Sequence, residues 1–221
     1  MSGKEERSTR ERLLDVAFDV FAAKGYEGTS VRDICSRAGV NLAAVNYHWR
    51  SKEQIWQAVC GECARWVVAR IGGHLDLSLP AEQAMVRLVD VVVDALVADP
   101  RPARLLAWAA LQAESLDVKL TFGIYAPIID GFVAFLERQR ANGALSSQMD
   151  VRVALSLLYS QVIFTFVDQA GHRNFFGSDV TSPEHAVRLK AALIESAQFL
   201  FGLRRAPAAH RAPRKPRRRA T

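Results

Sequence analysis

Apolar residues recur at intervals of three and four along most of the chain, which is the period of amphipathic helices. The first such stretch begins at Thr9 and ends near Gly25, a residue that suits a helix C-terminus. Further helices are predicted over Val31 to Ala38, Leu42 to Trp49, Ser51 to Arg70, Pro80 to Val97, Ala103 to Glu114, Asp117 to Ala141, Asp150 to Gln169 and Pro183 to Leu203. With no convincing strand pattern, the fold class is all-α, and 171–179 is expected to form a turn-rich connection.

Composition fits a folded protein of one large or two modest domains, because half of the 221 residues are hydrophobic and 24% are charged. The net charge of +6 is unevenly placed, since the last 18 residues contain eight Arg and Lys and no acid. Residues 1–203 therefore carry a formal charge of −2. Basicity of the whole chain is thus poor evidence for nucleic-acid binding, and residues 204–221 are expected to be a disordered basic tail.

The predicted location is the cytoplasm. The charged N-terminus argues against a signal peptide. The apolar stretch from Val153 to Val167 is short and interrupted by polar residues, so it is interpreted as a buried helix and no membrane contact is expected. Three cysteines do not make a disulfide scaffold in a chain of this length.

A helix-turn-helix is predicted between residues 29 and 53. Ser30 with Asp33 forms a capping box, Gly39 provides a tight turn, and Ser51 with Gln54 caps the long helix that follows. Such a motif places its second helix in the DNA major groove. The predicted base-reading residues are Asn41, Leu42, Ala44 and Asn46, and the predicted phosphate contacts are Thr29, Ser30, Tyr47, His48 and Lys52.

The motif resembles the DNA-binding domain of the TetR (tetracycline-repressor-like) family. The resemblance covers about Thr9 to Ile55, and the matching segments are Lys24-Gly25-Tyr26, Thr29-Ser30-Val31, Ile34-Cys35, Ala38-Gly39-Val40, Tyr47-His48-Trp49 and Ser51-Lys52-Glu53. Two positions depart from the pattern: Asn46 replaces the first member of a common Tyr pair, and Trp49 stands where Phe is commoner. The operator sequence of a relative therefore cannot be transferred to this chain.

The resemblance implies a dimeric repressor that binds a palindromic operator and is released by a small-molecule effector. It implies a three-helix DNA-binding domain (9–50) and a larger helical effector-binding and dimerisation domain (51–203). Residues 1–8 are polar and are expected to form a flexible N-terminus. The expected dimer interface comes from the last two long helices, through Leu155, Leu158, Val162, Phe166, Leu189, Leu193 and Leu200. Candidate effector-pocket aromatics are Trp66, Trp108, Phe122, Tyr125, Tyr159 and Phe164, although a helical domain of this length also needs such residues for its core.

The sequence is also compatible with other functions. The regulator could be an activator, or could respond to something other than a small molecule, or the chain could be a helical adaptor or enzyme with a vestigial motif. Cys60 and Cys63 fall on an apolar helical stripe, which favours core packing over a redox or metal sensor. No catalytic motif, cofactor site or metal site is recognised, so an enzyme is not expected.

Overall fold

The computed structural model describes residues 9–112 and 119–203, and within these ranges the protein is almost entirely helical. An isolated antiparallel bridge pairs Leu145 with Leu203, and no strand occurs in the described ranges. The prediction of an all-α fold is confirmed. The helices are α1 (Thr9–Lys24), α2 (Val31–Ala38), α3 (Leu42–His48), α4 (Lys52–Ile71), the short 3-10 helix η1 (Gly72–His74), α5 (Ala81–Ala98), α6 (Arg101–Leu111), α7 (Lys119–Ala141), α8 (Val151–Val167), α9 (Gln169–Phe176) and α10 (Pro183–Phe201).

Local signals set the ends of the first helices as the sequence predicted. The Ser30 hydroxyl accepts the backbone N–H of Asp33 at 3.1 Å, and the Asp33 carboxylate accepts the N–H of Ser30 at 3.1 Å. Gly39 ends α2 with a φ of 64°, the left-handed region that glycine enters without steric cost. Ser51 starts α4 by accepting the N–H of Gln54 at 3.2 Å.

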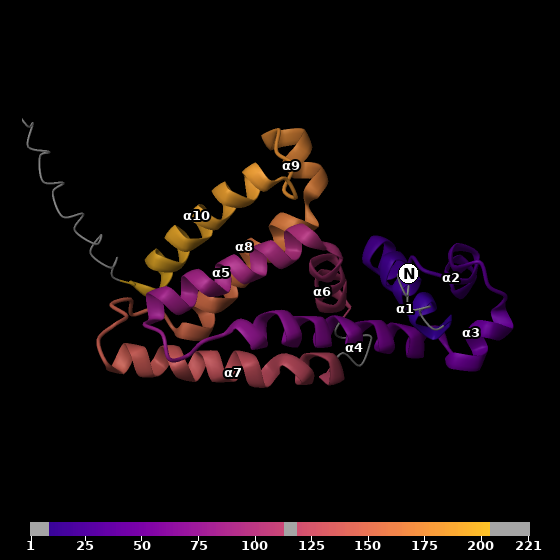
Figure 1. Cartoon of the computed structure of the whole chain (residues 1–221), viewed down its shortest axis with the longest axis horizontal. Helices are drawn as coiled ribbons and strands as arrows, with labels where there is room; N and C mark the ends of the chain where they lie inside the picture. The colour runs from indigo at the N-terminus through magenta and orange to yellow at the C-terminus, as the bar shows by residue number, and fades with distance from the viewer. Residues whose placement is uncertain (1–8, 113–118, 204–221) are drawn as a thin grey trace, which may run out of the picture.

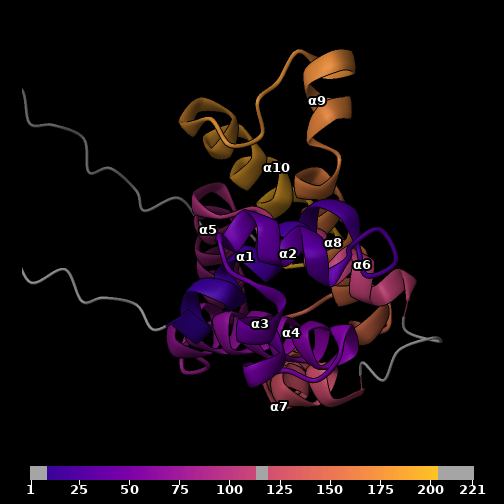
Figure 2. The ribbon, with the colours of Figure 1, turned by 90° about the vertical axis from the view of Figure 1, so that its right-hand side faces the viewer.

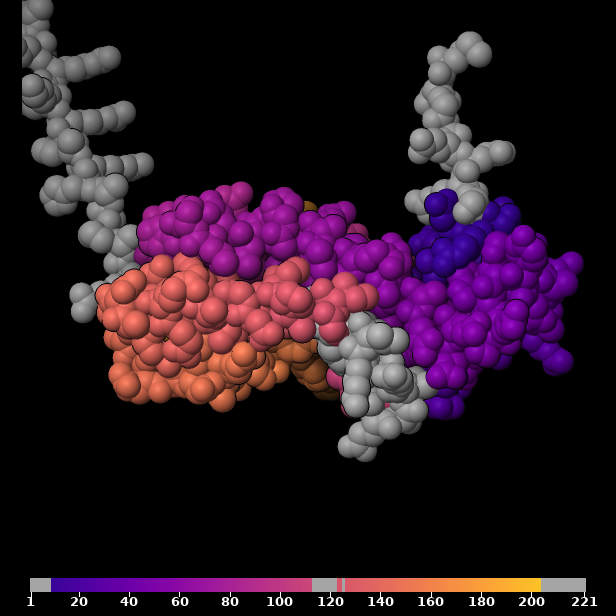
Figure 3. Space-filling view, turned by 90° about the horizontal axis from the view of Figure 1, so that it is seen from below, coloured from indigo at the N-terminus to yellow at the C-terminus, as the bar shows by residue number. Residues whose placement is uncertain are grey.

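The three N-terminal helices occupy one end of an elongated molecule (Figure 1). Helix α4 leaves this end directly after α3 and runs beside α7 into the body, where α5 packs on α10 and α6 packs on α8. Seen along the long axis, α1, α2 and α3 lie in front of the body helices (Figure 2). The underside shows the same division between an N-terminal end and a larger body (Figure 3).

Two apolar clusters form the core. The body cluster is built mainly on α5, α7, α8 and α10. The second cluster combines α1 to α3 with the first half of α4, and it includes Leu105, Leu106 and Ala109 of α6. Ile163 of α8 packs against both clusters. Helices α4 and α6 therefore join the N-terminal end to the body through buried side chains.

The structure corrects the prediction of a turn-rich connection after α8. Residues 169–176 form helix α9, so His172, Arg173 and Asn174 lie on a helix. The carboxylate of Asp168 accepts the N–H of Gly171 at 2.9 Å and starts α9, and Gly177 ends it with a φ of 61°. The chain bends by 78° between α8 and α9. That bend ends α8 at Val167, two residues before the predicted end.

A test for membrane-spanning segments among the described residues finds no single helix that is long and apolar enough. Helices α8 and α9 reach the required length and composition together, despite the 78° bend between them.

Candidate DNA-reading surface

Helix α3 is fixed to the molecule by its inner face. Val45 is 1% exposed, and it lies in the same apolar cluster as Ile34 and Cys35 of α2. Trp49, the residue after α3, is 6% exposed, and the Arg10 guanidinium lies 5.3 Å from its ring centre. Burial of these side chains on the α2–α3 pair gives the short helix one orientation relative to α1 and α4.

The outer face of α3 presents Leu42, Ala43, Asn46 and Tyr47 to solvent. Leu42 is 47% exposed and Tyr47 is 85% exposed. Steps of one and four residues place these positions on one side of a helix, opposite Val45. Ala44, which the sequence analysis assigned to base reading, is half-buried toward the inner side, and Ala43 takes the outward position. The burial of Val45 is the signal that distinguishes the two alanines.

Two other predicted contacts are engaged within the chain. The side-chain oxygen of Asn41 accepts the N–H of Ala44 at 2.9 Å and caps α3, so half of the bidentate amide that an adenine contact requires is occupied. Thr29 is 3% exposed and its hydroxyl donates to the Gly25 carbonyl at 2.7 Å. The Thr29 side chain therefore shapes the α1–α2 turn, and its burial does not fit the predicted phosphate contact.

The remaining predicted phosphate residues lie around this face. Ser30 is exposed at the start of α2. His48 is half-buried, with its ring 5.0 Å from that of Tyr47 and 5.6 Å from that of Trp49. Lys52 donates to the Thr29 carbonyl at 3.1 Å, and its ammonium lies 4.0 Å from the centre of the Tyr26 ring. Lys52 is thus held against the α1–α2 turn.

Positive charge borders the reading face. Arg32 and Arg37 are exposed on α2, and Arg50 is exposed directly after α3. The sequence alone does not single out these arginines as DNA contacts. Hydrogen bonds from Ser30 lower the pKa of Asp33, so this carboxylate keeps its negative charge at the N-terminus of α2, where the helix dipole favours it.

Four of the six aromatic residues predicted to line an effector pocket have described side chains. Trp66 packs against the body cluster, whereas Trp108 packs against the N-terminal cluster. Tyr159 is 49% exposed and Phe164 is 65% exposed. The side chains of Phe122 and Tyr125 lie outside the described residues.

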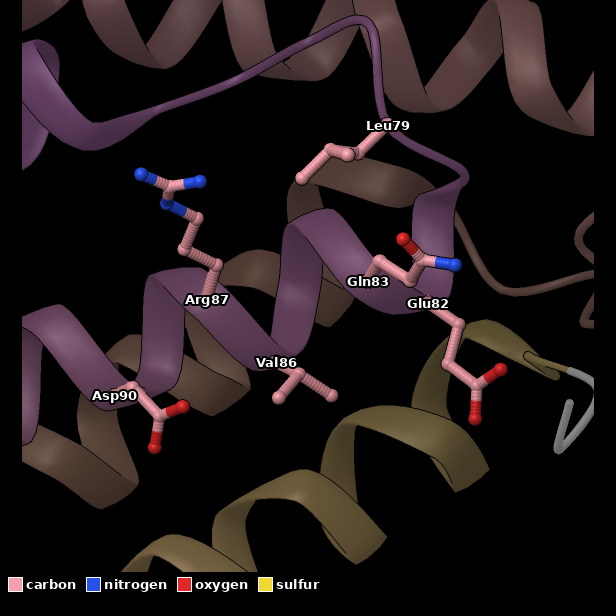
Figure 4. Close-up of a pocket in the computed structure, with 6 residues that line it drawn as sticks. All are labelled: Leu79, Glu82, Gln83, Val86, Arg87 and Asp90. Carbon is pink, nitrogen blue, oxygen red and sulfur yellow. The ribbon is translucent and has the colours of Figure 1, made fainter. Parts of the chain in front are cut away.

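One hollow of about 400 Å³ opens on the outer side of α5, close to α10 (Figure 4). A second hollow, of about 180 Å³, lies where the start of α5 approaches the end of α7. The first is lined by Leu79, Glu82, Gln83, Val86, Arg87 and Asp90, and the second by Pro80, Ala81, Glu82, Gln139, Ala144 and Leu203. Neither hollow contains any of the aromatic residues that the sequence analysis named.

The residues predicted for the dimer interface lie mostly inside the protomer. Leu158, Val162, Phe166, Leu193 and Leu200 are between 0% and 7% exposed, and Leu155 and Leu189 are half-buried against the same cluster. Side chains buried within one copy have little surface left to contact a second copy. The large apolar side chains that α8 and α10 do expose are Val153, Leu157, Tyr159, Phe164, Val187 and Phe199.

The two cysteines of α4 are core residues. Cys60 and Cys63 are each 1% exposed, and neither forms a disulfide. Burial raises the pKa of Cys63 well above its usual range, which favours the protonated thiol over the nucleophilic thiolate. Among the described residues no group of three or more His, Cys, Asp or Glu is arranged to hold a metal ion.

Contacts between α1 and α6 connect the candidate DNA-reading surface to the body. The Arg101 guanidinium donates to Asp15 at 3.0 Å, to Asp19 at 2.7 Å and to Asp99 at 2.8 Å. Further along α6, the Trp108 ring lies against Gly25, at the C-terminus of α1. An ion-pair network and an aromatic contact thus hold the same two helices together.

Comparison with known proteins agrees with this geometry. The protein-family model described as "Bacterial regulatory proteins, tetR family" matches residues 13–59. A second family model, described as "Tetracyclin repressor-like, C-terminal domain", matches residues 81–196. The chain belongs to the TetR family. Members of this family are transcriptional regulators that bind DNA and are not enzymes, and homodimers are typical of them.

Curated relatives share parts of the chain. The HTH-type transcriptional repressor KstR2 of Mycolicibacterium smegmatis is 36% identical over 69 residues, which are 31% of this chain and 34% of KstR2. The nicotine-responsive repressor HdnoR of Paenarthrobacter nicotinovorans is 31% identical over 119 residues, 53% of this chain and 54% of HdnoR. Each match thus spans well under two thirds of the relative.

Solved structures match over most of the chain. A tetR-family regulator from Rhodococcus RHA1 superposes with a TM-score of 0.69 at 20% identity, over 90% of this chain and all of that one. KstR2 of Mycobacterium tuberculosis superposes with a TM-score of 0.68 at 18% identity, over 86% and 95% of the two chains. These similarities show a shared fold.

Proposed function

We propose that this regulator is a dimeric repressor that binds a palindromic operator and is released by a small-molecule effector. The outward face of α3 carries the proposal, because Leu42, Asn46 and Tyr47 are exposed while Val45 fastens the opposite side to the core. A short helix held in this way can enter the major groove as a rigid element. Leu42, Ala43 and Asn46 would contact bases, and Ser30, Tyr47 and His48 would contact phosphates.

Exposed apolar residues on α8 support a dimer. This helix buries Leu158, Val162 and Phe166 inside the protomer, yet Val153 and Phe164 on its other side are 51% and 65% exposed. A helix that is apolar on both sides is normally covered on both sides. A second copy packed on α8 and α10 would cover these residues together with the exposed Val187 and Phe199. Two copies related by a two-fold axis would present two α3 helices to a palindrome.

Release by an effector would act through α4 and α6. Helix α4 begins four residues after α3 ends and continues into the body, and α6 packs on both α1 and α8. A ligand that favours a different tilt of α4 would change the spacing of the two α3 helices. Such a ligand shifts the equilibrium only by its difference in affinity for the two states. The nicotine-responsive relative supports an organic effector, and the aromatic residues named from the sequence, other than Phe164, stay candidates for contacting it.

Selection of bound sequences from a random DNA pool tests operator binding. We expect a palindromic consensus, and Asn46→Ala should weaken binding to it by about 5- to 150-fold for each half-site, the discrimination of one bidentate contact. Asn174→Ala is the matched control, because Asn174 is exposed on α9, a helix of the body that lies apart from α1, α2 and α3. A failure to enrich any sequence, or equal losses for the two variants, would contradict the proposal.

The effector part has a separate test. A thermal-shift screen of small organic compounds identifies ligands of the full chain, and each is then titrated against the protein–operator complex. We expect at least one ligand to lower operator affinity. If several ligands bind the folded protein and none changes its affinity for the operator, release by an effector is refuted and DNA binding is unaffected.

A further inference from the structure

The outward face of α3 carries no charged side chain. Its exposed residues are Leu42, Ala43, Asn46 and Tyr47, so it offers two aliphatic groups, one carboxamide and one phenol. Leu42 and Asn46 are four residues apart and therefore lie on the same side of the helix, one turn from each other. Ala43 lies beside Leu42 and extends its apolar surface. The face thus combines an aliphatic strip with an adjacent amide.

This chemistry suits some base pairs and not others. Bidentate recognition of guanine uses Arg or Lys, whereas adenine is recognised by Asn or Gln and the thymine methyl group by aliphatic contact. The outward face of α3 lacks the cation that guanine requires. It contains the amide that pairs with adenine and the apolar surface that packs on thymine.

Cations next to α3 are placed for phosphates. Arg32 and Arg37 lie on α2, which in this motif crosses the DNA backbone. The Lys52 ammonium is held by the Thr29 carbonyl at 3.1 Å and by the Tyr26 ring. Arg50 follows the end of α3, and its backbone N–H donates to Gln54 at 2.9 Å. Positive charge therefore borders the reading face without forming part of it.

We propose that α3 reads A·T base pairs, with Asn46 on an adenine and with Leu42 and Ala43 against thymine methyl groups. This inference rests on the proposed function, because it names the bases that the same surface recognises. The operator half-site is accordingly A·T at the pairs facing α3, and its affinity depends on the C5 methyl groups of thymine.

The test begins with selection from a random pool by the full chain. A second selection with Asn46→Ala locates the pair that Asn46 reads, because sequence preference relaxes at that position. In the selected operator, each thymine next to this pair is then replaced by uracil, which removes only the methyl group. Loss of one buried methyl corresponds to about a fourfold weaker affinity for each half-site, or about 15-fold when both are changed.

The protein side of the test uses Leu42→Ala. With this variant the uracil penalty at the thymine facing Leu42 should fall below about twofold. The matched control is Leu111→Ala, since Leu111 is 78% exposed on α6 and should leave the penalty unchanged. A palindromic consensus with G·C pairs facing α3, or an equal uracil penalty for wild type and Leu42→Ala, overturns this inference and leaves the proposed function intact. Failure to enrich any sequence overturns the proposed function itself.

Discussion

The contact between Gly25 and Trp108 gives a quantitative test of how the N-terminal end is joined to the body. A Cβ atom added at Gly25 would lie 2.8 Å from two carbons of the Trp108 ring. Gly25 also has a φ of 70°, a conformation that costs an L-residue about 1–2 kcal/mol. Crowding of this kind in a packed site typically costs a further 1–3 kcal/mol. We therefore expect Gly25→Ala to destabilise the protein by about 2–5 kcal/mol.

Gly39→Ala is the matched control. Gly39 has a φ of 64°, and an added Cβ there meets nothing within 4 Å. It should cost only the conformational strain of about 1–2 kcal/mol. For a protein of this size, an extra 1–3 kcal/mol at Gly25 corresponds to a melting temperature lower by about 2–12 °C than that of Gly39→Ala.

Thermal and urea unfolding followed by circular dichroism would measure both variants. Gly25→Ala should also be measured in a Trp108→Leu background, which completes a double-mutant cycle. The smaller side chain at position 108 should remove most of the extra destabilisation caused by Gly25→Ala. Equal penalties for the two glycines, or an unchanged Gly25→Ala penalty without Trp108, would refute the reasoning. The indole would then not be the group that restricts residue 25.

Further predictions concern charge, association, thiols and pH. Arg101→Gln should lower stability by about 1 kcal/mol at low ionic strength and by less in 1 M NaCl. Arg65→Gln, which breaks an exposed ion pair with Glu62, should have little effect, and urea unfolding at two salt concentrations would check both variants. Phe199→Ser should shift the protein toward monomer in sedimentation velocity while Leu111→Ser does not, and a monomeric wild type would contradict the proposed interface. A thiol reagent such as Ellman's should leave Cys60 and Cys63 unmodified in the folded protein and react after denaturation, and rapid native labelling would contradict their burial. Burial, and then the charges of His172 and Arg188, lower the pKa of His185. Protonation of His185 should therefore destabilise the folded protein as the pH falls below about 6.5, the usual pKa of histidine. The melting temperature should fall from pH 7.5 to 5.5 by less in His185→Gln than in wild type.

Local chemistry made the N-terminal helices predictable. Ser30, Gly39 and Ser51 act on backbone groups within four residues, so their effect is visible in the sequence without knowledge of the tertiary contacts. The same kind of signal was present for α9, in Asp168 as its cap and Gly177 as its end. That helix was missed because glycine and polar residues between these two positions resemble a turn.

Which face of a helix points to the core could not be decided without the tertiary structure. Helix α8 has apolar residues on both sides, so periodicity could not decide whether Leu158 and Val162 or Val153 and Phe164 face the protomer core. The structure buries the first pair. The same limit explains the exchange of Ala43 for Ala44, because two adjacent alanines differ only in which side of Val45 they occupy. The sequence therefore predicted where these helices lie along the chain and left undetermined which of their faces points to the core.

The distribution of the core explains why DNA reading and the body can be coupled. Leu105, Leu106 and Ala109 of α6 are buried in the cluster of α1 to α3, while Ala103, on the same helix, is buried in the body cluster. A rotation of α6 would consequently expose apolar surface in one cluster or the other, unless α1 moved with it. Arg101 adds three ion pairs that link α6, α1 and the end of α5. A rotation of α6 would therefore carry the N-terminal helices with it, because close-packed interiors shift between discrete arrangements instead of deforming continuously.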